Sequence, residues 1–230
     1  MGLELSVIRE NLDYLLWGRL AEGEPGGLVV TLALSLGAGV IAVLGGLTLA
    51  AVAWVFQGWT RRALVAWADL IRAVPLVLVI FWLYFLLPVL VGEVPGWASV
   101  VAALGWFGAA SVMHAVLAGL DGLARGQAEA ALASGLSRAQ TLRLVLLPQA
   151  LPSLVPSFVG LLAALIKDTS LAWVVNTPEL TTLANQVNNR TQVYPAEIFL
   201  TVAVLYLAPI CALSLGLRAF EHARARRPRG

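Results

Sequence analysis

The sequence has few charged residues for its length and only one cysteine. Of its 230 residues, 12% are charged and 60% are hydrophobic, whereas a typical soluble domain is about a quarter charged and about half apolar. The single cysteine, Cys211, can form no disulfide within the chain and no cysteine-based metal site. These shortages exclude a disulfide-bonded scaffold, a nucleic-acid-binding domain and a disordered chain, and the apolar excess predicts a polytopic membrane protein.

Motifs for catalysis are also missing. The sequence contains no glycine-rich phosphate loop of the GxxxxGKS or GxxxxGKT type, no histidine, cysteine and carboxylate spacing typical of a metal site, and no serine nucleophile motif. We therefore expect no catalytic residue, no metal and no cofactor on this chain. If it drives transport, the energy must come from a partner or from an ion gradient.

Five long apolar stretches dominate the sequence. A helix needs about 20 mostly apolar residues to cross the hydrocarbon core of a bilayer. Stretches that meet this requirement lie at residues 26–59, 63–92, 94–120, 144–166 and 198–217. They predict an all-α fold, a helical membrane bundle of about five transmembrane helices within residues 26–220.

The first 25 residues differ from the rest of the chain. They carry five acids against two arginines, so they lack the basic start of a signal peptide. Apolar residues recur at helical spacing, namely Leu5, Ile8, Leu12, Leu15 and Leu16. This pattern predicts an amphipathic helix that ends within residues 23–27 and that either lies on the membrane surface or packs on the bundle.

Basic residues gather on one side of the five predicted spans. Ten of them lie between spans one and two, between spans three and four, or after span five: Arg61, Arg62, Arg125, Arg138, Arg143, Arg218, Arg224, Arg226, Arg227 and Arg229. The other side holds Arg9, Arg19, Lys167 and Arg190 against nine acids. Because basic loops stay in the cytoplasm, we predict residues 1–25 outside and the basic tail, residues 221–230, in the cytoplasm.

The loop between spans three and four, residues 125–143, has a distinct local pattern. Residues 127–134 are rich in helix-favouring alanine, with Glu129 expected in the first turn, where a carboxylate suits the helix dipole. Gly135 is placed to end this helix, and Ser137 and Gln140 have capping-box spacing for a second one. The loop is either a simple connection or a small-residue element that binds in a groove of another protein.

Several short motifs in this order resemble a known family. Glu129-Ala130-Ala131 followed by Gly135, and then Leu147-Pro148-Gln149-Ala150, resemble the EAA motif of permease subunits in ATP-binding-cassette (ABC) importers, the polar amino acid branch in particular. The resemblance covers roughly residues 28–222 and includes segments at 72–75, 84–88, 167–171 and 178–180. It implies the type I importer permease fold, with Glu129, Ala130, Ala131 and Gly135 coupling the bundle to a cytoplasmic ATPase.

One motif departs from the family pattern. The family usually shows Glu-x-x-Arg-Gly-Thr-Pro in the second span, whereas this chain has Asp69 in place of the glutamate and Ala73-Val74 in place of Gly-Thr, before Pro75. The difference leaves the fold assignment unchanged, but it means that the ligand of typical family members is not carried over to this chain.

The resemblance also implies a function and partners. The chain would be a non-enzymatic permease subunit in a bacterial plasma (inner) membrane that passes a polar amino acid from an extracytoplasmic solute-binding protein to the cytoplasm. Its partners would be cytoplasmic ABC ATPase subunits, which bind ATP and Mg, a second permease subunit (the same or a sister chain) and membrane lipid, but no nucleic acid. Alternatives are an importer for another small zwitterion such as an opine, an ion-driven secondary transporter and a membrane-embedded enzyme. The secondary transporter would need a repeated second half, and the enzyme would need paired catalytic groups.

Polar residues beside the spans are candidates for the substrate path. Asp69 and Arg72 share a helix face and can pair. A charge within the bilayer costs on the order of 3 kcal/mol. The two residues therefore either line the substrate path, where the charges have a function, or lie at the cytoplasmic interface. Lys167, Asp168, Thr169 and Ser170 offer both charge signs and hydroxyls to an amino acid, or else an ion pair that anchors the end of the fourth span.

Prolines and a histidine interrupt two of the apolar stretches. Pro148, Pro152 and Pro156 are spaced four apart, and each lacks a backbone donor, so we expect kinks in the fourth span. The kinks either transmit motion from the Glu129 loop to a gate or shape the bundle statically. His114, a lone imidazole in an apolar stretch, is expected to be a hydrogen-bonded packing residue.

Overall fold

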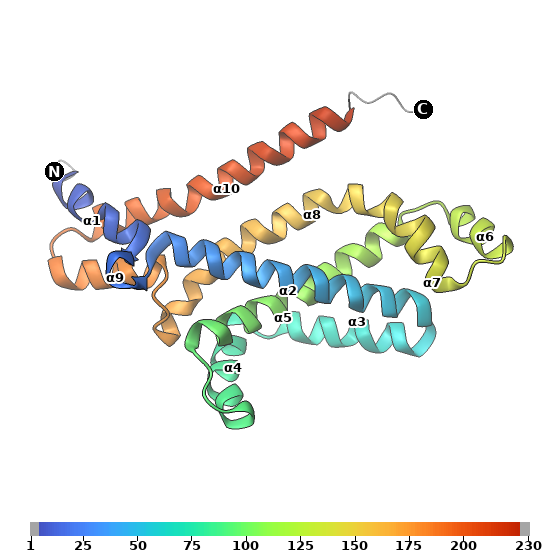
Figure 1. The fold of residues 1–230 in the computed structure, drawn as a ribbon, viewed down its shortest axis with the longest axis horizontal. Coiled ribbons are helices and arrows are strands. Elements are labelled where there is room, and N and C mark those ends of the chain that lie inside the picture. The colour runs from blue at the N-terminus through green and yellow to red at the C-terminus, as the bar shows by residue number, and fades with distance from the viewer. Residues whose placement is uncertain (1–4, 226–230) are drawn as a thin grey trace.

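The chain folds into long helices joined by short connections (Figure 1). The structure is a computed structural model, and it describes residues 5–225. In chain order the elements are α1 (Leu5–Trp17), β1 (Gly18–Arg19), the 3-10 helix η1 (Leu20–Glu22), β2 (Glu24–Pro25), α2 (Gly27–Phe56), α3 (Gly58–Ala73), α4 (Leu76–Val91), α5 (Gly96–Asp121), α6 (Arg125–Ala133), α7 (Arg138–Thr141), the π-helix η2 (Leu142–Leu146), α8 (Leu147–Asp168), the 3-10 helix η3 (Thr169–Val175), α9 (Leu180–Thr191) and α10 (Pro195–Ala225). Arg226, Arg227 and Arg229 of the predicted basic tail lie outside the described residues.

Within the described residues, four helical stretches are long and apolar enough to cross a membrane. They are α2, α5, the run from Arg138 to Val175 that includes α8, and α10. The 30 residues of α2 extend about 45 Å, which exceeds a hydrocarbon core of about 30 Å. These stretches correspond to the first, third, fourth and fifth predicted spans.

The second predicted span is a bent pair of helices. α3 and α4 meet at an angle of 97°, and if the bent pair is counted as one span, the described residues contain five candidate crossings. The ring of Pro75 restricts the residue before it to extended backbone, and Val74 indeed has φ −83° and ψ 135°. The helix therefore ends at Ala73, and the predicted span over residues 63–92 contains a break at this point.

Small residues allow α2 and α5 to pack closely. A Cβ atom at Gly105 would lie 2.7 Å from the side chain of Ile41, and a Cβ atom at Gly108 would lie 2.7 Å from that of Ala42. Either position would have to shift to accept a side chain. Such small residues are typical of helix interfaces in membranes, where the backbones approach each other directly.

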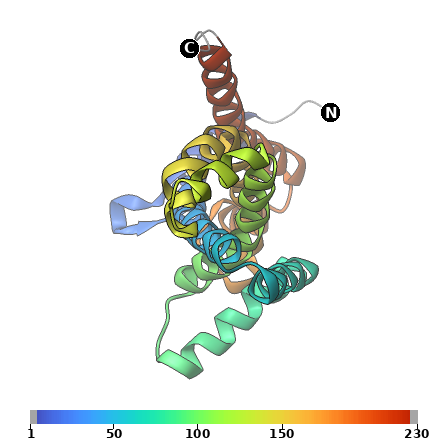
Figure 2. The ribbon, with the colours of Figure 1, turned by 90° about the vertical axis from the view of Figure 1, so that its right-hand side faces the viewer.

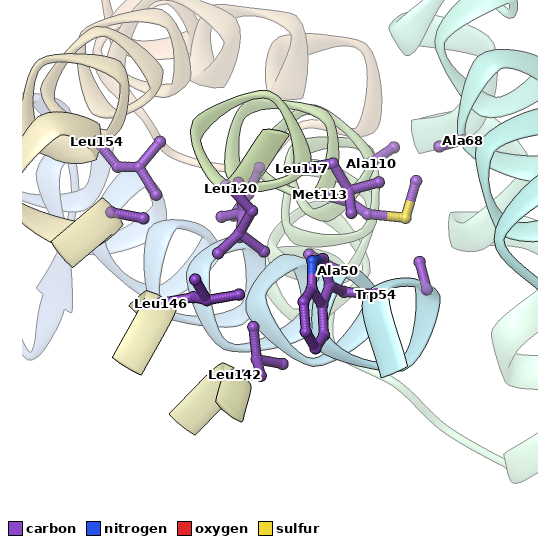
Figure 3. Close-up of a cluster of buried hydrophobic side chains, with 14 of the residues drawn as sticks. Ala50, Trp54, Ala68, Ala110, Met113, Leu117, Leu120, Leu142, Leu146 and Leu154 are labelled. Atoms are coloured by element: carbon purple, nitrogen blue, oxygen red, sulfur yellow. The ribbon is translucent and has the colours of Figure 1, made fainter. Parts of the chain in front are cut away.

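A buried apolar cluster joins this helix pair to the beginning of the fourth span (Figure 3). Trp54 of α2 and Leu117 and Leu120 of α5 lie in the same cluster as Leu142 and Leu146 of η2. All five side chains are at most 8% exposed. The helical turn that follows α7 is thereby fixed to the two central helices.

The N-terminal helix packs on the bundle, which is one of the two predicted arrangements. Val7 and Leu15 of α1 are buried in a cluster with Val187 of α9 and Ile198 of α10. The helix ends at Trp17, several residues before the predicted end at 23–27. Gly18, with φ 67°, turns the chain into the β1–β2 hairpin instead, which projects to the side of the bundle in Figure 2.

The two ends of the bundle carry different elements. α1 and α9 lie at one end together with the N-terminus, whereas α6, α7 and the C-terminal end of α10 lie toward the other (Figure 1). Arg61, at the start of α3, pairs with Asp121, at the end of α5, with 2.5 Å between Nη2 and Oδ2. We call the end with α1 and α9 the α9 end and the opposite one the α6 end.

Candidate functional site

The segment from α6 to α7 forms the predicted helix, tight break and second helix. Gly135 has φ 88°, the left-handed conformation that glycine adopts without a steric penalty. The N–H of Leu136 donates to the carbonyl of Ala131 at 3.2 Å, and the N–H of Gly135 donates to that of Leu132 at 3.0 Å. These two bonds satisfy the last carbonyls of α6 and confirm the predicted glycine stop.

The second helix begins with the predicted capping box. The Ser137 hydroxyl accepts from the N–H of Gln140 at 3.3 Å, and the Gln140 side chain accepts from the N–H of Ser137 at 2.8 Å. From there the chain stays helical through α7, η2 and α8. The break at Gly135 is thus held between two satisfied helix ends, and α7 leads directly into the fourth span, as predicted.

The two faces of α6 have different environments. Ala131 is 7% exposed, and Ala128 packs against the cluster that contains Trp54. Glu129, Ala130 and Gly135 are exposed, and Glu129 borders a pocket between α6 and the bundle together with Ala128 and Trp54. Ala131 and Ala128 are thus the sheltered residues of the element, while Glu129, Ala130 and Gly135 are its accessible ones.

The start of α6 differs from the prediction. The helix begins at Arg125, two residues before the predicted start at 127. Glu129 consequently lies in the second turn of α6 and not in the first, so a favourable interaction with the amino end of the helix dipole is weaker there.

Gln149, from the LPQA segment, connects α8 to this element. Its amide nitrogen donates to the carbonyl of Val145 at 2.8 Å and lies 3.4 Å from the side-chain oxygen of Gln127 in α6. The backbone between α7 and α8 is a π-helix, in which the N–H of Leu147 donates to the carbonyl of Leu142. A movement of α6 would therefore reach α8 through this side chain and through the Leu142–Leu146 turn.

The prolines of the fourth span leave α8 helical. Pro152 and Pro156 lie inside the helix, and the irregular turn, η2, precedes Pro148 instead. Because Pro156 has no N–H, the carbonyl of Pro152 lacks its helical donor. Arg224, at the end of α10, fills this position with a hydrogen bond of 2.6 Å from Nη1. The prolines thus create an acceptor that ties α10 to α8.

The carboxylate of Asp69 lies beside His114 and not beside Arg72. The distance from Oδ1 to Nε2 of His114 is 3.0 Å. The approach does not meet hydrogen-bond geometry, and this buried ring nitrogen has no hydrogen-bond partner. Within residues 5–225 no ion pair joins Asp69 to Arg72, and the predicted hydrogen bond of His114 is not formed at Nε2. Asp69 is 64% exposed and Arg72 is exposed too, so both are accessible.

The four polar residues at the end of the fourth span differ in accessibility. Thr169 is fully buried, and its hydroxyl donates to the carbonyl of Ile166 at 2.8 Å. Lys167 is exposed, and Asp168 and Ser170 are half-buried. Thr169 therefore has its hydroxyl proton already engaged in the helix, while the other three side chains remain accessible.

The two predicted path segments border the same apolar cluster. Leu165 and Ala172, on either side of residues 167–170, belong to a buried cluster with Val79 and Ile80 of α4. Val74, two residues after Arg72, packs against this cluster. The structure thus places the carboxyl end of α3 and the end of α8 around one group of apolar side chains.

Glu179 is a buried polar residue of the segment 178–180 that carries the family resemblance, but it was not predicted to be a site residue. It is fully buried and caps α9, where its two oxygens accept from the N–H groups of Thr181 and Thr182 at 2.8 and 2.7 Å. The Tyr206 hydroxyl of α10 adds a bond of 2.9 Å. Burial raises the pKa of this carboxyl above its ordinary value. The available signal was local, an acid directly before a helix, but its distant partner was not visible in the sequence.

Inner-membrane transport components resemble this chain over most of its length. Residues 29–227 match the family described as "Binding-protein-dependent transport system inner membrane component". The chain is 39% identical over 155 residues to the probable glutamine ABC transporter permease protein GlnP of Bacillus subtilis, covering 66% of this chain and 71% of that protein. It is 32% identical over 223 residues to the glutamate/aspartate import permease protein GltK of Escherichia coli, covering 91% and 93%.

Solved structures with the same fold include two transporters. One is an amino acid ABC transporter with histidines, with a TM-score of 0.82 and 24% identity over 97% of this chain and 100% of the other. The second is the MetNI methionine ABC transporter, with a TM-score of 0.75 and 24% identity over 93% and 98% of the two chains. At this level of identity the likeness concerns the fold alone.

Proposed function

The chain belongs to the family of binding-protein-dependent transport system inner membrane components, and we infer from this that it is the permease subunit of an ABC importer for a polar amino acid. The curated relatives that support the solute class are permeases for glutamine and for glutamate and aspartate. The chain is a multi-pass membrane protein and a transport subunit, since its family is one of transport components and several of its helices are apolar enough to span a membrane.

The helix–break–helix element at the α6 end is the observation that carries the mechanism. Its accessible residues Glu129, Ala130 and Gly135 would dock in a cleft of a cytoplasmic ATPase, while Ala128 packs against the bundle. Hydrolysis would take place on that separate partner, which would hold ATP and Mg. Closure of two ATPase subunits would move the docked element and, through Leu142 and Leu146, the central helices.

The proposed orientation follows from the charges at the two ends. The α6 end, with its basic residues, would face the cytoplasm, and the α9 end, with α1, would face outside. At the α9 end the chain would receive solute from a solute-binding protein. A second permease subunit, the same or a sister chain, would complete the channel.

Residues around the apolar cluster of α4 and η3 are proposed to line the solute path. Asp69 with its neighbour His114, and Arg72, would offer charges on one side. Lys167 and Asp168 would offer charges, and Ser170 a hydroxyl, on the other side, whereas Thr169 would shape the helix end. An amino acid carries an ammonium and a carboxylate, so accessible groups of both signs suit it.

Reconstitution tests this function directly. The chain is co-expressed with its chromosomal neighbours, purified, and placed in liposomes with candidate binding proteins and a panel of amino acids. We expect ATP hydrolysis that rises severalfold with one loaded binding protein, together with uptake of its amino acid. Failure to recover any ATPase partner would overturn the proposal, and stimulation by an opine alone would change the solute class.

A further inference from the structure

A cavity at the α9 end lies apart from the proposed path. It has a volume of about 840 Å³ and lies where α1 and the β1–β2 hairpin meet α2, α5 and α9. None of Asp69, Arg72 and residues 167–170 lines it. The cavity is therefore separate from the residues proposed to line the solute path.

One part of the cavity is an apolar trough along α2. Val30, Ala33, Leu34 and Gly37 line it at the spacing of a single helix face, and from Val30 to Gly37 this face extends about 10 Å. Trp97 and Val101 of α5 form the opposite wall. Because α2 is a candidate membrane span, an acyl chain is the apolar group that this environment supplies.

Gly37 keeps the trough open. A Cβ atom at this position would lie 3.5 Å from the Val101 side chain, which is ordinary contact. Alanine would therefore fit without distortion, whereas a longer side chain would occupy the trough itself. Trp97 is 57% exposed beside it, and an accessible indole is typical of the membrane–water interface.

The other part of the cavity is a charged rim on the hairpin. Arg19 and Glu24 both line the cavity and are paired across the two strands, so their side chains share one face of the hairpin. Glu22 lies 3.9 Å from Arg19 and is largely exposed. The cavity is thus lined by one guanidinium and one carboxylate, and the Glu22 carboxylate lies beside the guanidinium outside the lining. This set of charges suits a zwitterion with an accessible ammonium better than an anion.

We propose that this cavity binds one phospholipid with a phosphoethanolamine headgroup. The acyl chain lies along the α2 face from Val30 to Gly37, the phosphate is bound by Arg19, and the ammonium by Glu24. An amino acid would leave the trough unfilled, and an anionic headgroup has a phosphate for Arg19 but no ammonium for Glu24. The lipid belongs to the outer leaflet under the orientation proposed above, but its binding is independent of which solute is transported.

Native mass spectrometry of the purified transporter tests this inference. The protein is exchanged into detergent with phosphatidylethanolamine, phosphatidylcholine or phosphatidylglycerol of identical acyl chains. We expect wild-type protein to retain one phosphatidylethanolamine at least tenfold better than either other lipid, because only this headgroup combines a phosphate with an ammonium that has N–H donors. Equal retention of the three lipids would overturn the proposal.

Three variants locate the binding site. Gly37→Leu fills the trough and should reduce retention at least tenfold, whereas Gly216→Leu, a matched change at a helical glycine with open space around it, should not. Glu24→Gln, on the exposed hairpin, should abolish the preference for phosphatidylethanolamine over phosphatidylcholine with no effect on folding. Equal loss in both leucine variants, or an unchanged preference in Glu24→Gln, would contradict the site. Uptake measured after reconstitution of the same variants into liposomes separates this result from a failure of the transport function.

Discussion

The hydroxyl of Tyr206 in α10 donates a hydrogen bond of 2.9 Å to the carboxylate of Glu179, which caps α9. The same neighbourhood reaches α2, because the N–H of Leu180 donates to the hydroxyl of Thr31 at 3.1 Å. Glu179 thus connects α9, which follows the fourth span, with α10, the fifth span. The contact of Leu180 with Thr31 joins α9 to α2, the first span, beside it. Such a residue fixes the α9 end of the bundle.

Replacing this acid should destabilise the protein in a pH-dependent way. Glu179→Gln has one acceptor oxygen for two backbone N–H groups, so one donor is left unpaired at a cost of about 1–3 kcal/mol. Burial raises the pKa of the carboxyl above 4.5, so the proton is bound more tightly in the folded chain than in the unfolded one. The stabilisation from this proton is complete below pH 4.5 and is lost as the pH rises through the raised pKa.

Thermal unfolding between pH 4 and pH 8 measures this effect. The difference in melting temperature between wild type and Glu179→Gln should be largest at the acidic end and should narrow as the pH rises. Glu10→Gln, a change at an exposed acid of α1, should show neither effect. A difference that widens with pH would contradict a raised pKa.

Gly135 and Gly126 should respond in opposite ways to alanine. Neither position has an atom within 4 Å of an added Cβ, but only Gly135 has a positive φ. Gly135→Ala should cost about 1–2 kcal/mol and reduce binding-protein-stimulated ATP hydrolysis, because the angle between α6 and α7 changes. Gly126→Ala, within α6, should be neutral or slightly stabilising. Equal hydrolysis in both variants would show that the break does not matter for coupling.

The contact of Arg224 with α8 should depend on Pro156. Arg224→Ala removes the donor to the Pro152 carbonyl and should cost about 1–2 kcal/mol. In a Pro156→Ala background the helix regains an N–H for that carbonyl, so the same arginine substitution should cost much less. A double-mutant cycle from thermal unfolding, with Arg218→Ala as the matched arginine control, measures the coupling. Strict additivity would mean that the two residues act independently.

Asp168 is the accessible acid at the end of the fourth span, and its replacement should affect transport alone. Asp168→Asn keeps the size of the side chain but removes the charge proposed to hold an ammonium. We expect uptake at least tenfold lower with normal assembly of the permease and ATPase, measured by co-purification. Glu93→Gln, at an exposed acid between α4 and α5, serves as the control, and wild-type uptake in Asp168→Asn would remove this residue from the path.

Features set by neighbouring residues were predictable from the sequence. The glycine stop at Gly135 and the capping box of Ser137 with Gln140 depend on backbone groups within a few positions, and both are present. Apolar length likewise located four crossings. The break at Pro75 was missed because apolar residues continue on both sides of it, although a proline restricts its predecessor locally.

Contacts between distant segments were not predictable. Nothing near Asp69 in the sequence pointed to His114, which approaches it from α5. The acceptor for Arg224 exists only because a proline four residues after Pro152 lacks an N–H, and only the fold brings α10 to it. The same holds for Glu179, whose partner Tyr206 is on another helix.

Site-directed cross-linking tests the central claim that the exposed face of α6 docks on an ATPase. With the exposed Cys211 replaced by serine, single cysteines are placed by Ala130→Cys in α6 and by Glu22→Cys in the hairpin at the opposite end. A thiol-to-amine cross-linker is applied to membrane vesicles that contain the co-expressed partners. We predict that Ala130→Cys is joined to the ATPase, while Glu22→Cys is not and reacts with a membrane-impermeant thiol reagent from outside. Cross-linking of the ATPase through Glu22→Cys, or labelling of Ala130→Cys from outside, would contradict both the docking surface and the orientation.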